Sequence, residues 1–160
     1  MSHFGARQDS IQRRSVHVFF ATTGLVLVLT AGALFTAALE AAIARIEKDG
    51  TFFPLVFELR ANGAIQNVAV LETGAIEGAQ GVLDRLADVI RPRAADGTIR
   101  AAAIVRHRTD AATIEVRLRA ANYAADVLVP FEIASSGLLG HQRQLTLGSF
   151  TARPAANELF

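Results

Sequence analysis

Two carboxylates in the last third of the chain, Glu115 and Asp126, are the side chains best placed for catalysis. They fall on neighbouring predicted strands, where they can face each other and act as a general acid and a general base. The same positions suit ion pairs with Arg117 and Arg119 on the solvent side of a sheet, and we favour that interpretation. A small enzyme of the hydrolase type that uses Glu115 and Asp126 is the alternative prediction.

Arginines form a second group, on two consecutive predicted strands. Side chains alternate between the two faces of a strand, and five arginines share the outward parity: Arg100, Arg106, Arg108, Arg117 and Arg119. If the strands pair, these cations form a stripe that Glu115, Asp126 and Glu132 neutralise only in part. Such a stripe could bind an acidic protein partner or anionic lipid headgroups. An ordinary charged outer face of a sheet explains the same pattern, and we weigh that interpretation more heavily.

Other kinds of site are poorly supported. The chain has no cysteine, which excludes disulfides, thiolate metal ligands and cysteine nucleophiles. The four histidines, His3, His17, His107 and His141, show no pairing at metal-ligand spacing. Neither a nucleophile elbow around Ser135 and Ser136 nor a phosphate-binding loop is present. We therefore predict no metal and no cofactor, and we lean towards a protein that is not an enzyme.

Charge is unevenly distributed along the chain. Residues 1–14 are polar and carry Arg7, Arg13 and Arg14 against Asp9. Residues 15–39 carry no Lys, Arg, Asp or Glu, so residues 40–160 keep 13 of the 16 basic and 14 of the 15 acidic side chains. A nearly neutral domain lacks the basic excess of a nucleic-acid-binding protein. We predict no nucleic-acid partner.

The apolar run over residues 15–39 indicates a location. As a helix its 25 residues would span roughly 37 Å, which exceeds the roughly 30 Å hydrocarbon core of a bilayer. We predict a transmembrane helix that serves as an uncleaved signal anchor. Arg13 and Arg14 directly precede the run and favour a cytoplasmic N-terminus.

The run has two other interpretations. Ala31, Gly32 and Ala33 have the small-x-small form of a cleavage site, so the protein could instead be exported after cleavage near Ala33. A buried core helix is disfavoured, because the run is apolar on all sides and a domain of this size cannot cover every face. From Phe35 the pattern becomes amphipathic up to Gly50, which predicts that the same helix continues into the domain.

The remainder, residues 40–160, is predicted to be one α+β domain. Two β-rich segments, residues 51–60 and 64–72, flank Asn62-Gly63, a typical hairpin turn. In the first segment Phe53, Leu55, Phe57 and Leu59 are expected to point inward, and Glu58 and Arg60 outward.

The second half of the domain continues with one helix and three strands. Apolar residues recur at spacings of three and four over residues 75–91, which predicts a helix that stops before Pro92. Strands follow over residues 97–108, 112–120 and 123–133, and residues 144–150 suggest another short strand. The short connections imply antiparallel neighbours. The predicted fold is thus helix, two strands, helix and three strands, an antiparallel sheet with its helices on one face.

This layout resembles a family of uncharacterised bacterial small α+β proteins whose function is unknown. The family has a Gly-x-Phe-x-Pro-Phe start to its first strand and a late strand that ends in Leu-Pro-Tyr. The matching positions are Gly50, Phe52, Pro54 and Leu55, and Val129, Pro130 and Phe131. Members tend to be acidic where this chain has Arg106, Arg108 and Arg117, so no site is carried over there. The strand order also looks roadblock- or profilin-like, a likeness of topology that implies no function.

The leading functional prediction is a single-pass membrane protein whose α+β domain binds a partner or ligand without catalysis. Its expected partners are the membrane itself and an acidic protein or anionic lipid headgroups. Besides the small enzyme, a third prediction is a soluble or exported binding protein of the immunity or regulatory type.

Overall fold

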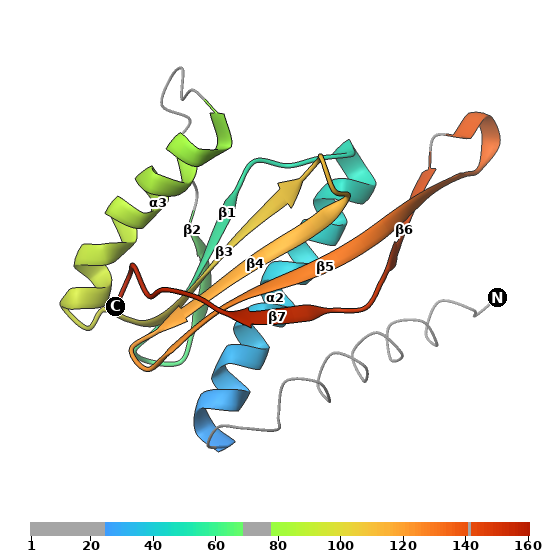
Figure 1. Cartoon of the computed structure of the whole chain (residues 1–160). Helices are drawn as coiled ribbons and strands as arrows, with labels where there is room; N and C mark the ends of the chain where they lie inside the picture. Colours follow the sequence, from blue (N-terminus) through green and yellow to red (C-terminus); the bar gives the residue numbers. More distant parts are fainter. Residues whose placement is uncertain (1–24, 69–77, 141) are drawn as a thin grey trace.

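The computed structural model describes residues 25–68, 78–140 and 142–160 (Figure 1). The predictions for residues 1–24, for 69–77 and for His141 lie outside these ranges. The elements in chain order are α2 (Leu25–Asp49), β1 (Leu55–Arg60), β2 (Ile65–Val68), α3 (Gly78–Ala95), β3 (Ile99–Arg108), β4 (Thr113–Ala120), β5 (Tyr123–Ser136), the 3-10 turn η1 (Leu138–Gly140), β6 (Gln142–Leu147) and β7 (Thr151–Pro154).

The strands form one antiparallel sheet in the order β2-β1-β3-β4-β5-β6. The strand β7 also pairs with β5. Residues 125–128 of the long β5 pair with β7, and its residues 131–136 pair with β6. The predicted α+β class and antiparallel sheet are confirmed. The hairpin between β1 and β2 turns through Gly63 at a φ of 87°, and the Asn62 side chain accepts a hydrogen bond from the Ala64 N–H at 3.0 Å. The strand β7 was not predicted.

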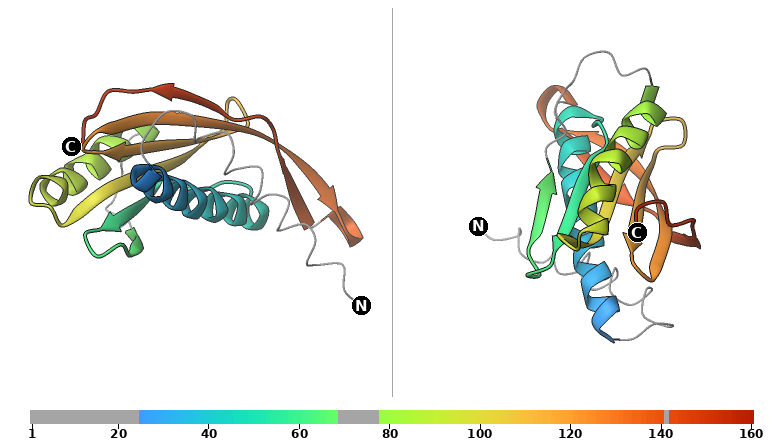
Figure 2. Two further views of the ribbon diagram at one scale, coloured as in Figure 1. Left: turned by 90° about the horizontal axis from the view of Figure 1, so that it is seen from below. Right: turned by 90° about the vertical axis from the view of Figure 1, so that its left-hand side faces the viewer.

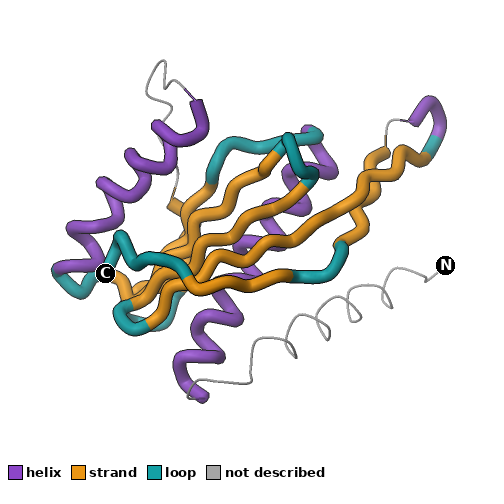
Figure 3. Tube along the Cα trace, in the orientation of Figure 1, coloured by secondary structure: helices purple, strands orange, loops and turns teal. Residues whose placement is uncertain are grey.

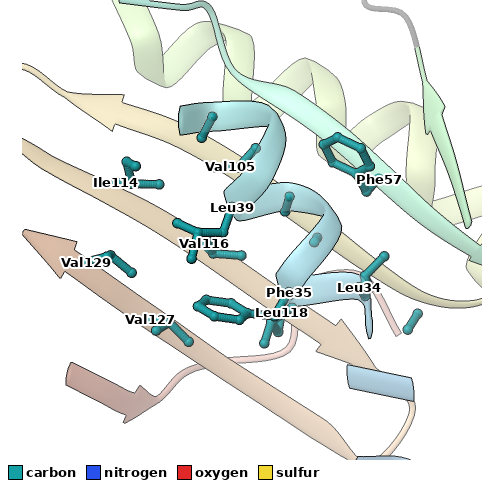
Figure 4. Packing of buried hydrophobic residues seen from close by; sticks show 14 of the residues in the cluster. Leu34, Phe35, Leu39, Phe57, Val105, Ile114, Val116, Leu118, Val127 and Val129 are labelled. Carbon is teal, nitrogen blue, oxygen red and sulfur yellow. The ribbon is translucent and has the colours of Figure 1, made fainter. Parts of the chain in front are cut away.

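The helix α2 packs lengthwise on one face of the sheet and builds the larger core (Figure 4). Its buried residues recur at spacings of three and four: Leu34, Phe35, Ala38, Leu39, Ala42 and Ile46. They meet the inward side chains of β1, β3, β4 and β5, among them Phe57, Val105, Val116 and Val127. The helix ends at Gly50, whose φ of 79° is readily adopted only by glycine and whose N–H bonds to the Ile46 carbonyl. The predicted continuity of this helix into the domain is confirmed from residue 25 onward.

The end of the apolar run therefore belongs to the core. Residues 34 and 35 and residues 38 and 39 are buried against the sheet, whereas Ala33 and Glu40 are exposed. The buried-helix interpretation, which we disfavoured, is correct for this end of the run, because the sheet needs to cover only one side of the helix. No helix within the described ranges is both long and apolar enough to cross a bilayer.

The helix α3 lies on the opposite face of the sheet from α2 (Figure 2). Its residues Leu83, Leu86 and Ile90 pack with Val56 of β1 and Ile104 of β3 in a smaller, second core. The prediction that both helices share one face is wrong, because β1 and β3 are apolar on both faces and each face needs a cover. The helix also runs through Pro92 to Ala95, beyond its predicted end.

The position of α3 reverses two expectations for the first strand. Glu58, predicted to point into solvent, is fully buried beneath α3, with 0% of its surface exposed. Phe53, predicted to point inward, lies ahead of β1 and is 80% exposed. The predicted alternation of side chains within β1 is correct, but the face that carries Glu58 is covered by α3 and is not exposed to solvent.

One part of the sheet extends beyond its body. Residues 131–136 of β5 pair with β6. These two strands project as a hairpin past the end of α2 (Figures 2 and 3). We call residues 131–147 the arm. Leu138, Leu139 and Gly140 of η1 form its tip.

Candidate binding surface

The predicted arginine stripe lies on the α3 side of the sheet, next to the area that α3 covers. Arg106 of β3 stands opposite Glu115 of β4, and Arg117 of β4 stands opposite Asp126 of β5. Arg108 shares this face and makes its ion pair with Asp110, at 3.6 Å. Arg100 is exposed at the start of β3, beside an irregularity in the pairing with β1, and takes no part in the cluster. Three of the five predicted arginines are thus brought together.

Two adjacent sets of ion pairs lie here, one around Glu115 and one around Arg119, and Arg117 of the first set stands opposite Asp126 of the second. We call the six residues together the arginine network: Arg106, Glu115, Arg117, Arg119, Asp126 and Glu158.

Glu115 is the centre of the first half of the network and is only 1% exposed. Its Oε2 accepts hydrogen bonds from Arg106 Nε at 3.1 Å and Nη2 at 2.7 Å, and its Oε1 accepts one from Arg117 Nε at 2.7 Å. Burial raises the pKa of this carboxyl, but the hydrogen bonds and charges of Arg117 and Arg106 outweigh burial and leave the pKa below its ordinary value. Glu115 is therefore ionised at neutral pH.

Arg119 is the centre of the second half and is 3% exposed. Its Nε donates to Glu158 Oε2 at 2.8 Å, and its Nη2 donates to Asp126 Oδ1 at 2.9 Å. Its Nη1 donates to the carbonyls of Leu118 and Ala125 at 3.0 and 3.1 Å. Every nitrogen of this guanidinium is engaged, so Arg119 has a structural role and ties the C-terminal segment to the sheet.

Arg117 differs from Arg119 because most of its hydrogen-bonding capacity is unused. Only its Nε makes a hydrogen bond, and its two terminal nitrogens bond to no residue in the described part of the chain. Arg153 of β7 stands on the other side of Asp126 and is exposed. Arg153 thus adds a further positive charge beside Asp126.

The predicted acid–base pair takes another form. Glu115 and Asp126 lie on adjacent strands but not opposite each other, since Glu115 is in register with Leu128. Both carboxylates accept hydrogen bonds from arginines, as the ion-pair interpretation predicted. The predicted solvent-exposed position is wrong for Glu115 and Arg119, which are buried among their ion-pair partners. Glu115, with both oxygens occupied and a lowered pKa, is poorly suited to proton transfer near neutral pH.

His107 is the one histidine within the described ranges. Its ring stacks on Phe52 with the centroids 6.0 Å apart, contacts Phe131, and shares a hydrogen bond with Thr51 Oγ1 at Nδ1, at 2.9 Å. Burial lowers its pKa. Among the described residues no group of three or more His, Cys, Asp or Glu could hold a metal ion. Ser135 and Ser136 lie exposed on the arm.

Three charged residues that matter here were missed by sequence reasoning. Arg93 of α3 donates from Nη2 to Glu58 Oε2 at 2.6 Å and thereby pairs the buried carboxylate of β1. Arg153 sits on the unpredicted β7, and Glu158 reaches Arg119 from 39 positions further along the chain. The sequence carries no local signal for these contacts, because each joins segments that are distant in the chain or lie on an unpredicted strand.

Comparison of the chain with models of known families, with curated proteins and with solved structures finds no match. The resemblance carried by Gly50, Phe52 and Pro54 thus stays a prediction.

Proposed function

We propose that the protein is a membrane-anchored binding module whose arginine network receives an acidic side chain of a partner protein, and that it is not an enzyme. The observation that carries the binding part is the state of Arg117. Buried Glu115 holds its Nε, while both terminal nitrogens are left without a partner among the described residues. A guanidinium fixed in this way presents a planar fork that matches a carboxylate.

The position of the network favours a protein over the headgroups of the anchoring bilayer. His107, the neighbour of Arg106, stacks on Phe52 just past the end of α2. Arg106 therefore lies near the C-terminal end of α2, whereas the apolar run enters the domain at the N-terminal end (Figure 1). Headgroups around the anchor would be at the other end of the sheet.

The anchor is supported by the length of apolar chain that precedes the core. Among residues 31–49 of α2, whose burial is described, the first buried residue is Leu34, so we propose that residues 15–33 occupy a bilayer. As a helix they would span roughly 28 Å, close to the hydrocarbon thickness of about 30 Å. Because α2 is one continuous helix, the domain would be held to the bilayer without a flexible linker.

The same boundary favours a second candidate, an exported binding protein. Cleavage after Ala33 would leave Leu34 and every later core residue of α2 in the mature chain. Mass spectrometry and carbonate extraction of the full-length product distinguish the two candidates. A full-length chain that stays in the membrane supports the anchor, and a soluble chain that starts at residue 34 overturns it.

The binding proposal is tested with a fluorescently labelled hexaglutamate peptide as the probe. Arg117→Gln should weaken its binding about tenfold, the effect of losing one charge-assisted hydrogen-bonding group. Arg45→Gln, an exposed arginine on α2, is the matched control and should bind like the wild type. Equal affinities of the Arg117→Gln variant and the wild type would contradict the proposal.

A further inference from the structure

The tip of the arm presents two large apolar side chains to water. Leu138 is 94% exposed and Leu139 is 88% exposed, between Gly137 and Gly140. Leu139 adopts a φ of 67°, a left-handed conformation that costs free energy for a branched side chain. A strained turn with two leucines in water is retained only if the tip gains something elsewhere.

The arm is held in place by the last turn of α2. Glu47 Oε1 accepts a hydrogen bond from the Leu145 N–H at 3.2 Å, and Arg143 Nη1 donates to the Lys48 carbonyl at 3.0 Å. The Arg143 guanidinium also lies against Gly50, where an added Cβ would be 3.6 Å from it. Helix and arm are thus braced together, and the tip has a defined direction.

That direction is away from the N-terminal end of α2. The braces join the arm to the C-terminal end of α2, and in two views the arm extends further beyond this end (Figures 1 and 2). The residues before Leu34 leave the sheet at the opposite end. A bilayer that holds residues 15–33 would therefore lie at one end of the molecule and the leucine tip at the other.

We propose that Leu138 and Leu139 insert into the surface of a second, anionic bilayer, so that the protein bridges two membranes; the two-membrane arrangement rests on the proposed anchor. Two leucine side chains bury on the order of 200 Å², well below the roughly 800 Å² per partner of a stable protein interface. A bilayer needs no complementary pocket. In addition, residues 133–147 of the arm contain no Asp or Glu but include Arg143, so no carboxylate of this segment would repel anionic headgroups.

The absence of tryptophan from the chain permits a direct test. The full-length Leu138→Trp variant is inserted into phosphatidylcholine host vesicles, and acceptor vesicles of phosphatidylcholine and phosphatidylglycerol are added. With brominated lipid in the acceptor alone, we expect at least twofold quenching and a blue shift of the emission. Val89→Trp, on the exposed side of α3, is the control and should show neither change. The double variant Leu138→Ser, Leu139→Ser should capture at least tenfold fewer acceptor vesicles than the wild type.

Several results would overturn the proposal. Quenching only by brominated host lipid would place the tip on the anchoring bilayer. No quenching by either lipid, or a blue-shifted emission before acceptor vesicles are added, would place the tip in water or against protein. Loss of the chain from host vesicles in carbonate would overturn the anchor alone, since quenching by acceptor vesicles can still be measured with the chain in solution.

Discussion

Two buried carboxylates on the same face of the sheet, Glu58 under α3 and Glu115 in the arginine network, respond to burial in opposite ways. Both are almost completely inaccessible to solvent. Burial raises the pKa of Glu58 above its ordinary value, and the charges of Arg93 and Arg60 only reduce that rise. The pKa of Glu115 lies below its ordinary value, because the hydrogen bonds and charges of Arg117 and Arg106 outweigh burial.

The difference lies in how many hydrogen bonds each carboxylate receives. Among the described residues Glu58 accepts one hydrogen bond, from Arg93, and its Oε1 has no partner there. The buried Nε atoms of Arg60 and Arg93 have no partner among these residues either. Both oxygens of Glu115 are occupied, by two guanidinium groups. An ionised buried carboxylate is favourable only when its hydrogen-bonding capacity is met. The buried charge is therefore stabilised in the arginine network, and not in the area that α3 covers.

Removing the central carboxylate should have the largest effect. Glu115→Ala leaves Arg106 and Arg117 without their shared partner, and we expect the free energy of unfolding to fall by about 3–5 kcal/mol. Urea denaturation measures this change. Glu58→Ala is the matched comparison and should cost clearly less, and equal losses for the two variants would contradict the distinction.

The loss of stability at acid pH should depend on Glu115. Its folded pKa lies below the unfolded value near 4.5, so its contribution is complete above that pH and is lost as the pH falls towards the folded pKa. The wild type should therefore lose more stability than Glu115→Gln between about pH 5 and pH 3. Parallel pH profiles for the two proteins would show that Glu115 is not stabilised in its ionised form.

The exposed end of the network should matter less for stability. Arg117→Gln removes one charge-assisted hydrogen bond to Glu115, while the two bonds from Arg106 remain. We expect a loss of about 1 kcal/mol in the free energy of unfolding. Thermal and urea denaturation provide the measurement. A loss as large as that of Glu115→Ala would identify Arg117 as a structural residue and weaken its role in binding.

The smallest effect, with the opposite sign, is expected at Glu58. Its folded pKa is raised, so the protonated form is stabilising below pH 4.5 and that contribution is lost as the pH rises through the folded pKa. Glu58→Gln keeps a hydrogen-bond acceptor for Arg93 and removes the cost of a buried charge. It should be neutral or more stable than the wild type by up to about 1 kcal/mol at pH 7, with no gain near pH 4. A marked loss at pH 7 would show that the ionised pair is net stabilising.

Local pattern was sufficient for most of the elements. Alternation in Thr113–Ala120 gave the correct strand and the correct faces, because both of its neighbours in the sheet are strands. Asn62-Gly63 located the first hairpin, and the outward parity of Arg106, Arg117 and Arg119 located the network. For Glu58 the same alternation predicted the wrong environment, because α3, not solvent, covers that face.

The sequence by itself determined the apolar run, the period-2 strands, the turn at Asn62-Gly63 and a domain with almost no net charge. These features depend on residues that are neighbours in the chain. Only the tertiary structure decided that Leu34 and Phe35 belong to the core, that Glu58 is buried, and that Arg119 meets Glu158. It also decided that the arm lies at the C-terminal end of α2. Such features depend on which surfaces meet after the sheet has formed, and alternation cannot say whether a helix, a distant carboxylate or water will cover a face.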